Sequence, residues 1–470
     1  MAGDSVAENK PLHLPSRFAD LPARWGWQRL DETCEGVFDC PHSTPRLVDA
    51  GPFVVRSQDI ITGVFRTEQA ARVSEETYKE RTSRVVPTRG DLLYSREGTY
   101  FGIAAEVPEQ TRVCLGQRMV LIRPKSDLVD FRFLCRWLNS PIMASHIHGY
   151  RDGTVAERLN LPTIRALPVL VPPLPEQRAI AHILGTLDDK IELNRRMKET
   201  LEAMARALFK SWFVDFDPVR AKHALSKVEG AEGRPSTSSG QAIPGLPKPL
   251  ADLFPDSFED SELGEIPTGW RAAPLPDVFD VNPTRALRRG VEAPYLDMAN
   301  MPTRGHSPDD VIDRTFGSGM RFMNGDTLVA RITPCLENGK TAFVDFLKTG
   351  EVGWGSTEYI VLRPKPPLPE EFAYCLARSA EFRDFAIQSM TGSSGRQRVP
   401  AESLSHFRVV AAPRPIAELF GRLIKPHFGR ARAATEEGRT LAALRDTLLP
   451  KLISGELRVK DAEKMAEATA

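Results

Sequence analysis

Apolar residues recur every three or four positions over one long stretch of the chain, which begins "PPLPEQRAIAHILGTLDDK" at position 172. This spacing keeps them on one side of an α-helix. Pro175 suits the first turn, where its missing N–H is no loss. From there to Trp212 the helix would be about 57 Å long, more than the core of one small domain requires. The predicted apolar stripe consists of Ile180, Leu184, Leu187, Ile191, Leu201, Met204, Leu208 and Trp212.

A second stripe of the same kind lies near the C-terminus and includes Leu441, Leu444 and Leu448. Because a long apolar stripe is normally buried against another helix, we predict that the two helices pack together, antiparallel. Pro426 and Gly429 predict a kink or break in the second helix. The alternative is that each helix packs only on its own domain, but stripes this long would extend beyond a single small domain.

The chain also repeats itself at about half its length. "RPK" at 123–125 returns at 363–365, an offset of 240 residues that also relates Pro175 to Pro415. Further upstream the register drifts, as loop insertions would cause. Several matches in the same order indicate an internal duplication. The upstream pairs are "GDLLYSR" (90–96) with "GDTLVAR" (325–331), "GPFVVRSQDI" (51–60) with "EAPYLDMANM" (292–301), and "GW" at 26–27 with "GW" at 269–270.

Between these landmarks, short strand-like runs bounded by Gly, Pro or Asp alternate with helical segments. The pattern predicts an α+β protein in which two similar mixed α/β domains are separated by two long antiparallel helices, related by a pseudo-twofold repeat. The predicted divisions are a first domain at 1–173, a first long helix at 174–225, a linker rich in Gly, Pro and Ser at 226–262, a second domain at 263–413, a second long helix at 414–456 and a tail at 457–470.

Composition narrows the class of protein. The 470 residues are 41% hydrophobic and carry equal numbers of basic and acidic side chains, 62 of each, so any basic surface must be local. No apolar run reaches the ~18 residues that span a bilayer, and the N-terminus does not read as a signal peptide. The six cysteines are scattered without a C-x-x-C pair, which predicts reduced thiols in the cytoplasm and no zinc site.

Two similar domains on a helical ruler suit a target with two separated sites, such as duplex DNA. Two corresponding loops, "RDGTVAERLNLP" (151–162) and "TGSSGRQRVP" (391–400), combine small residues with side chains able to read base edges. A surface salt bridge is the simpler interpretation of any one arginine. Lys340 fits a DNA contact and a salt bridge equally well. The paired loops nevertheless favour DNA contact. The candidate residues are Arg96, Arg151, Thr154, Arg158, Arg331, Lys340, Ser393, Ser394, Arg396, Gln397 and Arg398.

Three sequence features resemble enzyme motifs, but each lacks residues that the motif requires. "LENGKT" (336–341) ends like a phosphate-binding loop, but Pro334 stands where that loop needs glycine. "VNPTR" (281–285) lacks the second proline and the aromatic residue of an amino-methyltransferase motif. His146 and His148 have no accompanying carboxylate cluster. We therefore expect no catalytic residues, no bound cofactor and no metal site in this chain.

Four segments carry a resemblance to a known family that spans nearly the whole chain. They are residues 172–222, "LFPDSFEDSELGEIPTGW" (253–270), "RITPCLENGKTAFV" (331–344) and "GSSGRQRVP" (392–400). In them the chain resembles the specificity subunit of a type I restriction-modification system. The resemblance implies that each globular part is a target recognition domain reading one half of a split, asymmetric double-stranded DNA site. It also implies that the long helices dock two methyltransferase subunits and that restriction subunits join them, with S-adenosylmethionine, ATP and Mg²⁺ bound by those partners.

One departure concerns the entry to the second helix. The first helix begins with "PLPEQ" (173–177), whereas the second begins with "PRPIAELF" (413–420) and lacks the Glu-Gln pair. The resemblance therefore predicts the first methyltransferase contact more firmly than the second. Two other functions remain open: a helical scaffold whose two heads bind protein partners, and an enzyme with its site in a head cleft.

Overall fold

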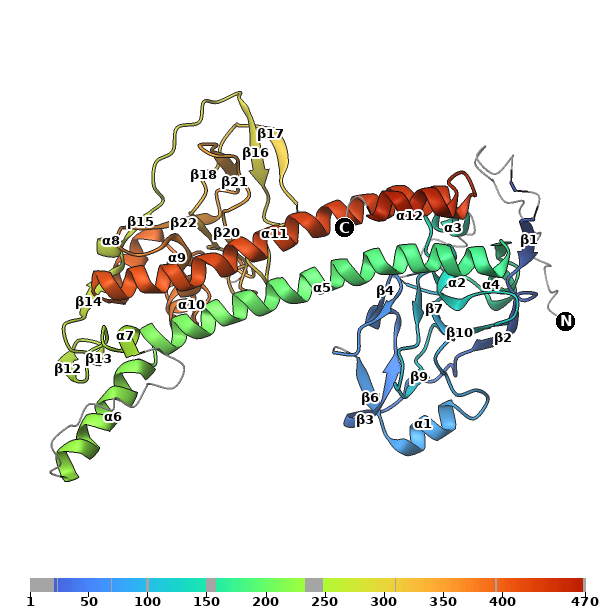
Figure 1. Cartoon of the computed structure of the whole chain (residues 1–470), viewed down its shortest axis with the longest axis horizontal. Helices are drawn as coiled ribbons and strands as arrows, with labels where there is room; N and C mark the ends of the chain where they lie inside the picture. The colour runs from blue at the N-terminus through green and yellow to red at the C-terminus, as the bar shows by residue number, and fades with distance from the viewer. Residues whose placement is uncertain are drawn as a thin grey trace. The chain divides into compact units, whose positions relative to one another are not determined.

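The computed structural model describes residues 21–467 apart from 23, 69, 99–100, 149–157, 233–247, 309 and 394. By their contacts the residues form two compact units. Unit 1 comprises Met1–Ile191 and Arg439–Ala470, and unit 2 comprises Glu192–Gly438. Each unit contains a mixed α/β head and one part of each of two 40-residue helices, α5 (Leu174–Phe213) and α11 (Arg414–Ile453) (Figure 1).

The head of unit 1 is built on a four-stranded antiparallel sheet in the order β2-β10-β7-β8. A second sheet, β6-β3-β9, pairs β3 with β9 in parallel. The strands are β1 (Gly26–Arg29), β2 (Cys34–Asp39), β3 (Leu47–Val55), β4 (Ile60–Ile61), β5 (Val64–Phe65), β6 (Ala71–Val73), β7 (Leu92–Ser95), β8 (Ala104–Glu106), β9 (Val113–Leu115), β10 (Met119–Pro124) and β11 (Pro168–Val171). The helices are α1 (Glu75–Arg81), α2 (Phe131–Leu138), α3 (Pro141–His148) and α4 (Leu161–Arg165).

The head of unit 2 follows the same plan, with the four-stranded sheet β15-β22-β19-β20 and a second sheet, β17-β16-β21-β18. Its strands are β12 (Phe258–Ser261), β13 (Gly264–Pro267), β14 (Arg271–Pro274), β15 (Phe279–Val281), β16 (Glu292–Leu296), β17 (Ile312–Thr315), β18 (Met320–Phe322), β19 (Thr327–Ala330), β20 (Thr341–Phe343), β21 (Gly353–Gly355), β22 (Tyr359–Pro364) and β23 (Arg408–Ala411). Its helices are α7 (Lys248–Ala251), α8 (Leu275–Val278), α9 (Glu370–Ala377) and α10 (Ala380–Gln388).

The internal duplication is confirmed by the matching strands. β10 and β22 end in the two "RP" pairs and show the same order of buried and half-buried residues. The pairing of 51–60 with 292–301 also holds, since these segments include parts of β3 and β16, each paired in parallel within its second sheet. The "GW" match is displaced by two residues. Trp27 pairs with Leu170 and Ala272 with Val410, so the ladders equate Trp27 with Ala272.

The two long helices run antiparallel within each unit, as predicted. In unit 1 the start of α5 shares a buried cluster with the end of α11, through Leu184 and Leu448 among others. In unit 2 the end of α5 meets the start of α11, through Phe209 and Phe420. Both clusters also contain residues of the heads, so the helices pack on each other and on the heads together. Among the described residues, no helix is long and apolar enough to cross a membrane.

The predicted buried stripe of α5 is wrong at Met204, and it omits several residues that the structure buries. Met204 is 52% exposed, and in unit 2 the buried positions of α5 are Asn194, Glu202, Ala205, Phe209, Trp212 and Phe213. Ile191, Leu201, Leu208 and Leu444 are only half-buried, whereas Ile180, Leu184, Leu187, Trp212, Leu441 and Leu448 are fully buried.

The helix boundaries also differ from those predicted. α5 ends at Phe213 and not at 225, because Phe216 adopts a left-handed φ of 55° that turns its ring into the core against Trp270. A separate helix, α6 (Asp217–Glu232), follows. The predicted linker at 226–262 therefore includes the end of α6, helix α7 and strand β12, while 233–247 lie outside the described residues. The expected tail contains a further helix, α12 (Val459–Glu467).

The predicted break in the second long helix is absent, because α11 is continuous through Pro426. Pro426 and Gly429 are both exposed, whereas Ile424 and Phe428 are buried. The hydrogen bond that proline removes is therefore lost on the solvent side, where water satisfies the freed carbonyl.

Candidate nucleic-acid interface

Charged side chains gather at one edge of the four-stranded sheet in unit 1. β2 ends at Asp39, β7 is followed by Arg96, and β10 is preceded by Arg118. Since these neighbouring strands are antiparallel, the two ends and the one beginning lie at the same edge. We call this group, together with Glu97 and Arg158, the polar edge of unit 1.

Arg96 is the buried centre of this edge. Its side chain is 5% exposed, and its Nη1 lies 3.1 Å from the Asp39 carboxylate. Its backbone N–H donates to the Arg118 carbonyl, and its carbonyl accepts from the Leu159 N–H, at 3.0 and 2.8 Å. Arg96 therefore supports the neighbouring segments and does not present its guanidinium to solvent, so a direct DNA contact from this residue stays a prediction.

The remaining candidates of unit 1 are only partly described. Arg158 is exposed and forms an isolated backbone bridge with Glu97. Arg151 and Thr154 lie outside the described residues. The sequence reading missed Arg118, which is 56% exposed and lies 3.4 Å from the Glu97 carboxylate through its Nε. The available signal was its position just before the "MVLI" strand.

Unit 2 repeats the same backbone ladder at its own polar edge, which consists of Arg331, Glu358, Gln397 and Arg398. The Arg331 N–H donates to the Glu358 carbonyl, and the Arg331 carbonyl accepts from the Val399 N–H, at 3.0 and 2.9 Å. These bonds equate Arg331 with Arg96, and Glu358 with Arg118. Arg331 is half-buried, and its Nε has no hydrogen-bond partner among the described residues.

The predicted glycine-rich loop closes on this edge. Thr391 and Arg398 exchange two backbone hydrogen bonds of 2.9 Å each. Gly392 and Gly395 have φ values of 121° and 79°, which glycine adopts with little strain. Ser393 and Arg396 are exposed at the loop, and Ser394 lies outside the described residues.

Arg398 and Gln397 lie where the loop rejoins the sheet. Arg398 is held side-on by Glu358, with 2.9 Å from Nε and 2.8 Å from Nη2 to the same carboxylate oxygen. This hydrogen bonding raises the pKa of Arg398 above its ordinary value. Gln397 is half-buried, and its backbone carbonyl accepts from the Thr333 N–H at 3.0 Å.

The Lys340 side chain is held by backbone carbonyls. Its ammonium donates to the backbone carbonyls of Met298 and Ala299, the latter at 3.1 Å, and forms no ion pair among the described residues. It therefore ties the segment after β16 to the start of β20. The salt-bridge expectation is wrong, and a DNA contact by Lys340 stays a prediction.

The glutamine of the "PLPEQ" entry is a structural residue. Gln177 is fully buried, donates to the carbonyls of Leu128 and Pro172, and accepts from the Asp130 N–H at 2.9 Å. At the corresponding place α11 carries the fully buried Ala417. The missing glutamine is therefore at a buried position in both helices, and the methyltransferase contact of the second helix stays a prediction.

A second buried polar group that the sequence did not suggest lies in unit 2. His306 is fully buried, with Nε2 3.4 Å from Asp345 and Nδ1 3.9 Å from Glu202 of α5. Burial alone would lower the pKa of His306, but the two carboxylates outweigh it and raise the pKa. The Tyr374 hydroxyl donates to the other Glu202 oxygen at 2.7 Å. This cluster fastens the loop before β17 to the long helix.

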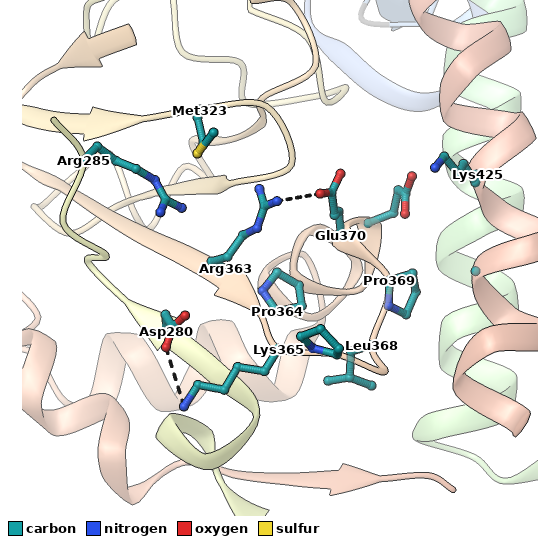
Figure 2. A pocket seen from close by; sticks show the side chains of 13 residues that line it. Asp280, Arg285, Met323, Arg363, Pro364, Lys365, Leu368, Pro369, Glu370 and Lys425 are labelled. Carbon is teal, nitrogen blue, oxygen red and sulfur yellow. Dashed lines mark hydrogen bonds and ion pairs between the residues drawn. The ribbon is translucent and has the colours of Figure 1, made fainter. Parts of the chain in front are cut away.

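Each unit also has an open cavity at the opposite end of the strand that carries the "RP" pair. In unit 2 it measures about 620 Å³, and Figure 2 shows Arg363 ion-paired to Glu370 and Lys365 to Asp280 in its wall. In unit 1 a cavity of about 390 Å³ contains the Arg123–Asp91 pair. Both arginines are therefore paired with carboxylates. Among the described residues, no group of three or more His, Cys, Asp or Glu side chains is arranged to hold a metal ion.

Two heads of one plan, each with an arginine-bearing polar edge, and a shared pair of antiparallel helices define a two-part recognition protein. A family model described as the type I restriction modification DNA specificity domain matches residues 57–203. Residues 57–203 therefore match a type I restriction-modification DNA specificity domain, and most of the chain is similar to curated specificity subunits of such systems.

Curated relatives match along most of their length. The chain is 25% identical over 408 residues to the type I restriction enzyme HindI specificity subunit of Haemophilus influenzae, covering 78% of this chain and 87% of that protein. It is 24% identical over 414 residues to the MjaIX specificity subunit of Methanocaldococcus jannaschii, covering 85% and 84%. A type I restriction-modification S subunit from M. genitalium shares the fold, with a TM-score of 0.52 at 14% identity over 92% of this chain and 96% of that one.

Proposed function

We propose that this chain reads a two-part sequence in duplex DNA, one half-site by each head. The observation that carries the proposal is the repeated polar edge, in which the same backbone ladder places arginines at equivalent positions of both heads. Only the major groove distinguishes all four base pairs, so the loops at these edges enter that groove. Because the side chains of the two edges differ, the half-sites differ and the target is asymmetric.

The proposal includes methyltransferase docking on the long helices. In unit 2, α5 carries a second apolar line at heptad spacing that does not face the head. Leu193 and Met204 on this line are 56% and 52% exposed, and Met197 between them is half-buried. Seams of this kind pack against a partner helix. We assign this line to a methyltransferase subunit, with two such subunits and the restriction subunits completing the complex.

The cofactors and the location complete the proposal. We assign S-adenosylmethionine, ATP and Mg²⁺ to the partner subunits and none of them to this chain. A cytoplasmic location fits the cysteines, all six of which are free thiols.

The test is to co-express the chain with the methyltransferase encoded beside it and to map methylated positions in a random DNA library. The expected result is one asymmetric site of two short sequences separated by unread base pairs. Binding to that duplex should weaken steeply as salt rises, because basic side chains displace counterions from phosphates. A palindromic site would contradict the assignment of one half-site to each head. A complex that forms but ignores duplex DNA would favour the scaffold alternative.

A further inference from the structure

Each polar edge contains an arginine–glutamate ion pair, but the two residues of the pair occupy different positions in the two heads. In unit 1 the pair joins Arg118 to Glu97, and in unit 2 it joins Arg398 to Glu358. The backbone ladder equates Arg118 with Glu358, so the arginine of one head stands where the other head has the carboxylate. The pair is therefore present in both heads, but its arginine comes from a different segment in each, since Arg118 directly precedes β10 and Arg398 closes the loop that begins at Thr391.

The exposure of the two partners is also alike in both heads. Arg118 and Arg398 are 56% and 43% exposed, whereas Glu97 and Glu358 are 20% and 24% exposed. A surface pair that only adds stability needs no such inequality. Here the carboxylate lies against the protein and the guanidinium extends from it toward solvent.

The two carboxylates contact the Nε side of each guanidinium, which is not the side that contacts a base. Glu358 occupies the Nε and Nη2 edge of Arg398, and Glu97 lies against the Nε of Arg118. The edge formed by the two terminal nitrogens points away from this contact. Among the residues that the structure describes, the terminal nitrogen Nη1 of Arg398 makes one long contact, 3.4 Å to the Arg396 carbonyl. Two parallel N–H groups are what the O6 and N7 acceptors of guanine require.

The backbone at Arg118 supports the same conclusion. Its φ of 68° lies in the left-handed region, which is unfavourable for a residue with a side chain. Glycine would adopt it freely. An arginine kept there, directly before a buried strand, is aimed by its backbone as well as by Glu97.

Building on the proposed function, we propose that Arg118 and Arg398 each read a guanine, one in each half-site, and that Glu97 and Glu358 are positioning residues that fix the two guanidinium planes. The carboxylates need not touch DNA. The hydrogen bonds from Arg398 to Glu358 and the ion pair of Arg118 with Glu97 limit the rotation of a flexible side chain before binding. Because the two arginines come from different segments of their heads, the two heads read their half-sites differently.

The experiment uses the whole complex with its methyltransferase and compares methylation of library sites by the wild type with that by Glu97→Gln and Glu358→Gln. Each variant should lose about tenfold of its discrimination at one G·C pair. The two variants should relax opposite half-sites and leave the other half unchanged. Arg118→Lys and Arg398→Lys, which keep the charge but not the two-pronged edge, should relax the same positions as the matching glutamine variants.

Controls come from ion pairs remote from the polar edges. Arg112→Gln breaks the exposed pair with Glu75 in unit 1, and Arg432→Gln breaks the pair with Glu436 on α11. Both should leave the base preferences unchanged. Uniformly weaker methylation with unchanged base preference in the Glu97 and Glu358 variants would overturn the inference and show a purely stabilising role. Relaxation of both half-sites by one variant would overturn it as well. A wild-type complex without any two-part site would instead refute the proposed function itself.

Discussion

Arg445 of α11 and Asp188 of α5 stand 257 positions apart in the chain, and Nη1 of the arginine lies 2.9 Å from Oδ1 of the aspartate. The other oxygen of Asp188 accepts from Arg136 of α2. One carboxylate therefore joins the head of unit 1 to both long helices. Asp188 also shows how the antiparallel pairing of the helices is fixed by polar contacts beside the apolar stripe.

Replacing Asp188 with asparagine should loosen this junction. The change leaves Arg136 and Arg445 facing each other without the shared anion, and we expect unit 1 to lose about 1–2 kcal/mol. Hydrogen exchange should accelerate in residues 180–191 and 441–453. Asp189→Asn, at an exposed neighbouring position, is the control and should leave exchange unchanged. Equal behaviour of the two variants would show that Asp188 does not join these elements.

Gln177→Ala should destabilise the start of α5. It leaves the Leu128 and Pro172 carbonyls and the Asp130 N–H buried without their partner, at a cost of about 2–4 kcal/mol. Denaturant unfolding followed by hydrogen exchange of residues 174–187 measures this cost. Arg178→Ala, at an exposed position, is the control. Stability unchanged by the Gln177 variant, together with loss of methyltransferase binding, would contradict the structural role.

His306 predicts a pH dependence of unit 2. Because its pKa is raised on folding, its stabilising effect is complete below the ordinary histidine value of about 6.5 and is lost as the pH rises through the raised value. The pKa of Glu202 is lowered despite its burial, so its contribution is lost only as the pH falls through that lowered value. Unit 2 should therefore be most stable at pH values between the lowered pKa of Glu202 and the raised pKa of His306.

The variant His306→Gln should abolish the fall in stability on the alkaline side. Denaturant midpoints of unit 2, read by hydrogen exchange of residues 198–206 and 302–307 across this pH range, test it. His406→Gln, at an exposed position of the same unit, should retain the wild-type profile. A His306 variant with the wild-type slope would mean that another group titrates.

Met204→Glu should prevent a methyltransferase from docking while leaving the fold intact, because this side chain is already 52% exposed. Co-purification of the two proteins measures docking, and thermal unfolding checks the fold. Ala433→Glu places the same charge on an exposed position of α11. If the α11 variant were the one to lose the partner, the docking line would be misassigned.

The long helices should set the spacing of the DNA site. Both cross from one unit to the other, between Ile191 and Glu192 in α5 and between Gly438 and Arg439 in α11. Adding one helical turn at both points should change the number of unread base pairs without changing the bases that are read. Methylation mapping decides this, and altered bases at constant spacing would refute the ruler.

The sequence determined the large features because each depends on a local period. Recurrence at three and four residues gave two long helices, and a repeat at 240 residues gave two heads of one plan, both of which the structure contains. The loop at 391–400 could also be identified from the sequence as a candidate for DNA contact, since its glycines and arginines lie close together in the chain. The order of strands in the sheets was not, because strand pairing joins segments far apart in sequence.

Burial and pairing were decided only by the tertiary structure. The sequence placed Met204 on the buried stripe, but the surrounding head buries Glu202 and Ala205 instead, with the Glu202 carboxylate satisfied by Tyr374. Nothing local distinguishes Arg96, which is buried on Asp39, from Arg118, which extends into solvent. A side chain's periodicity fixes which face of an element it occupies, whereas its exposure and partner depend on residues brought near by the rest of the fold.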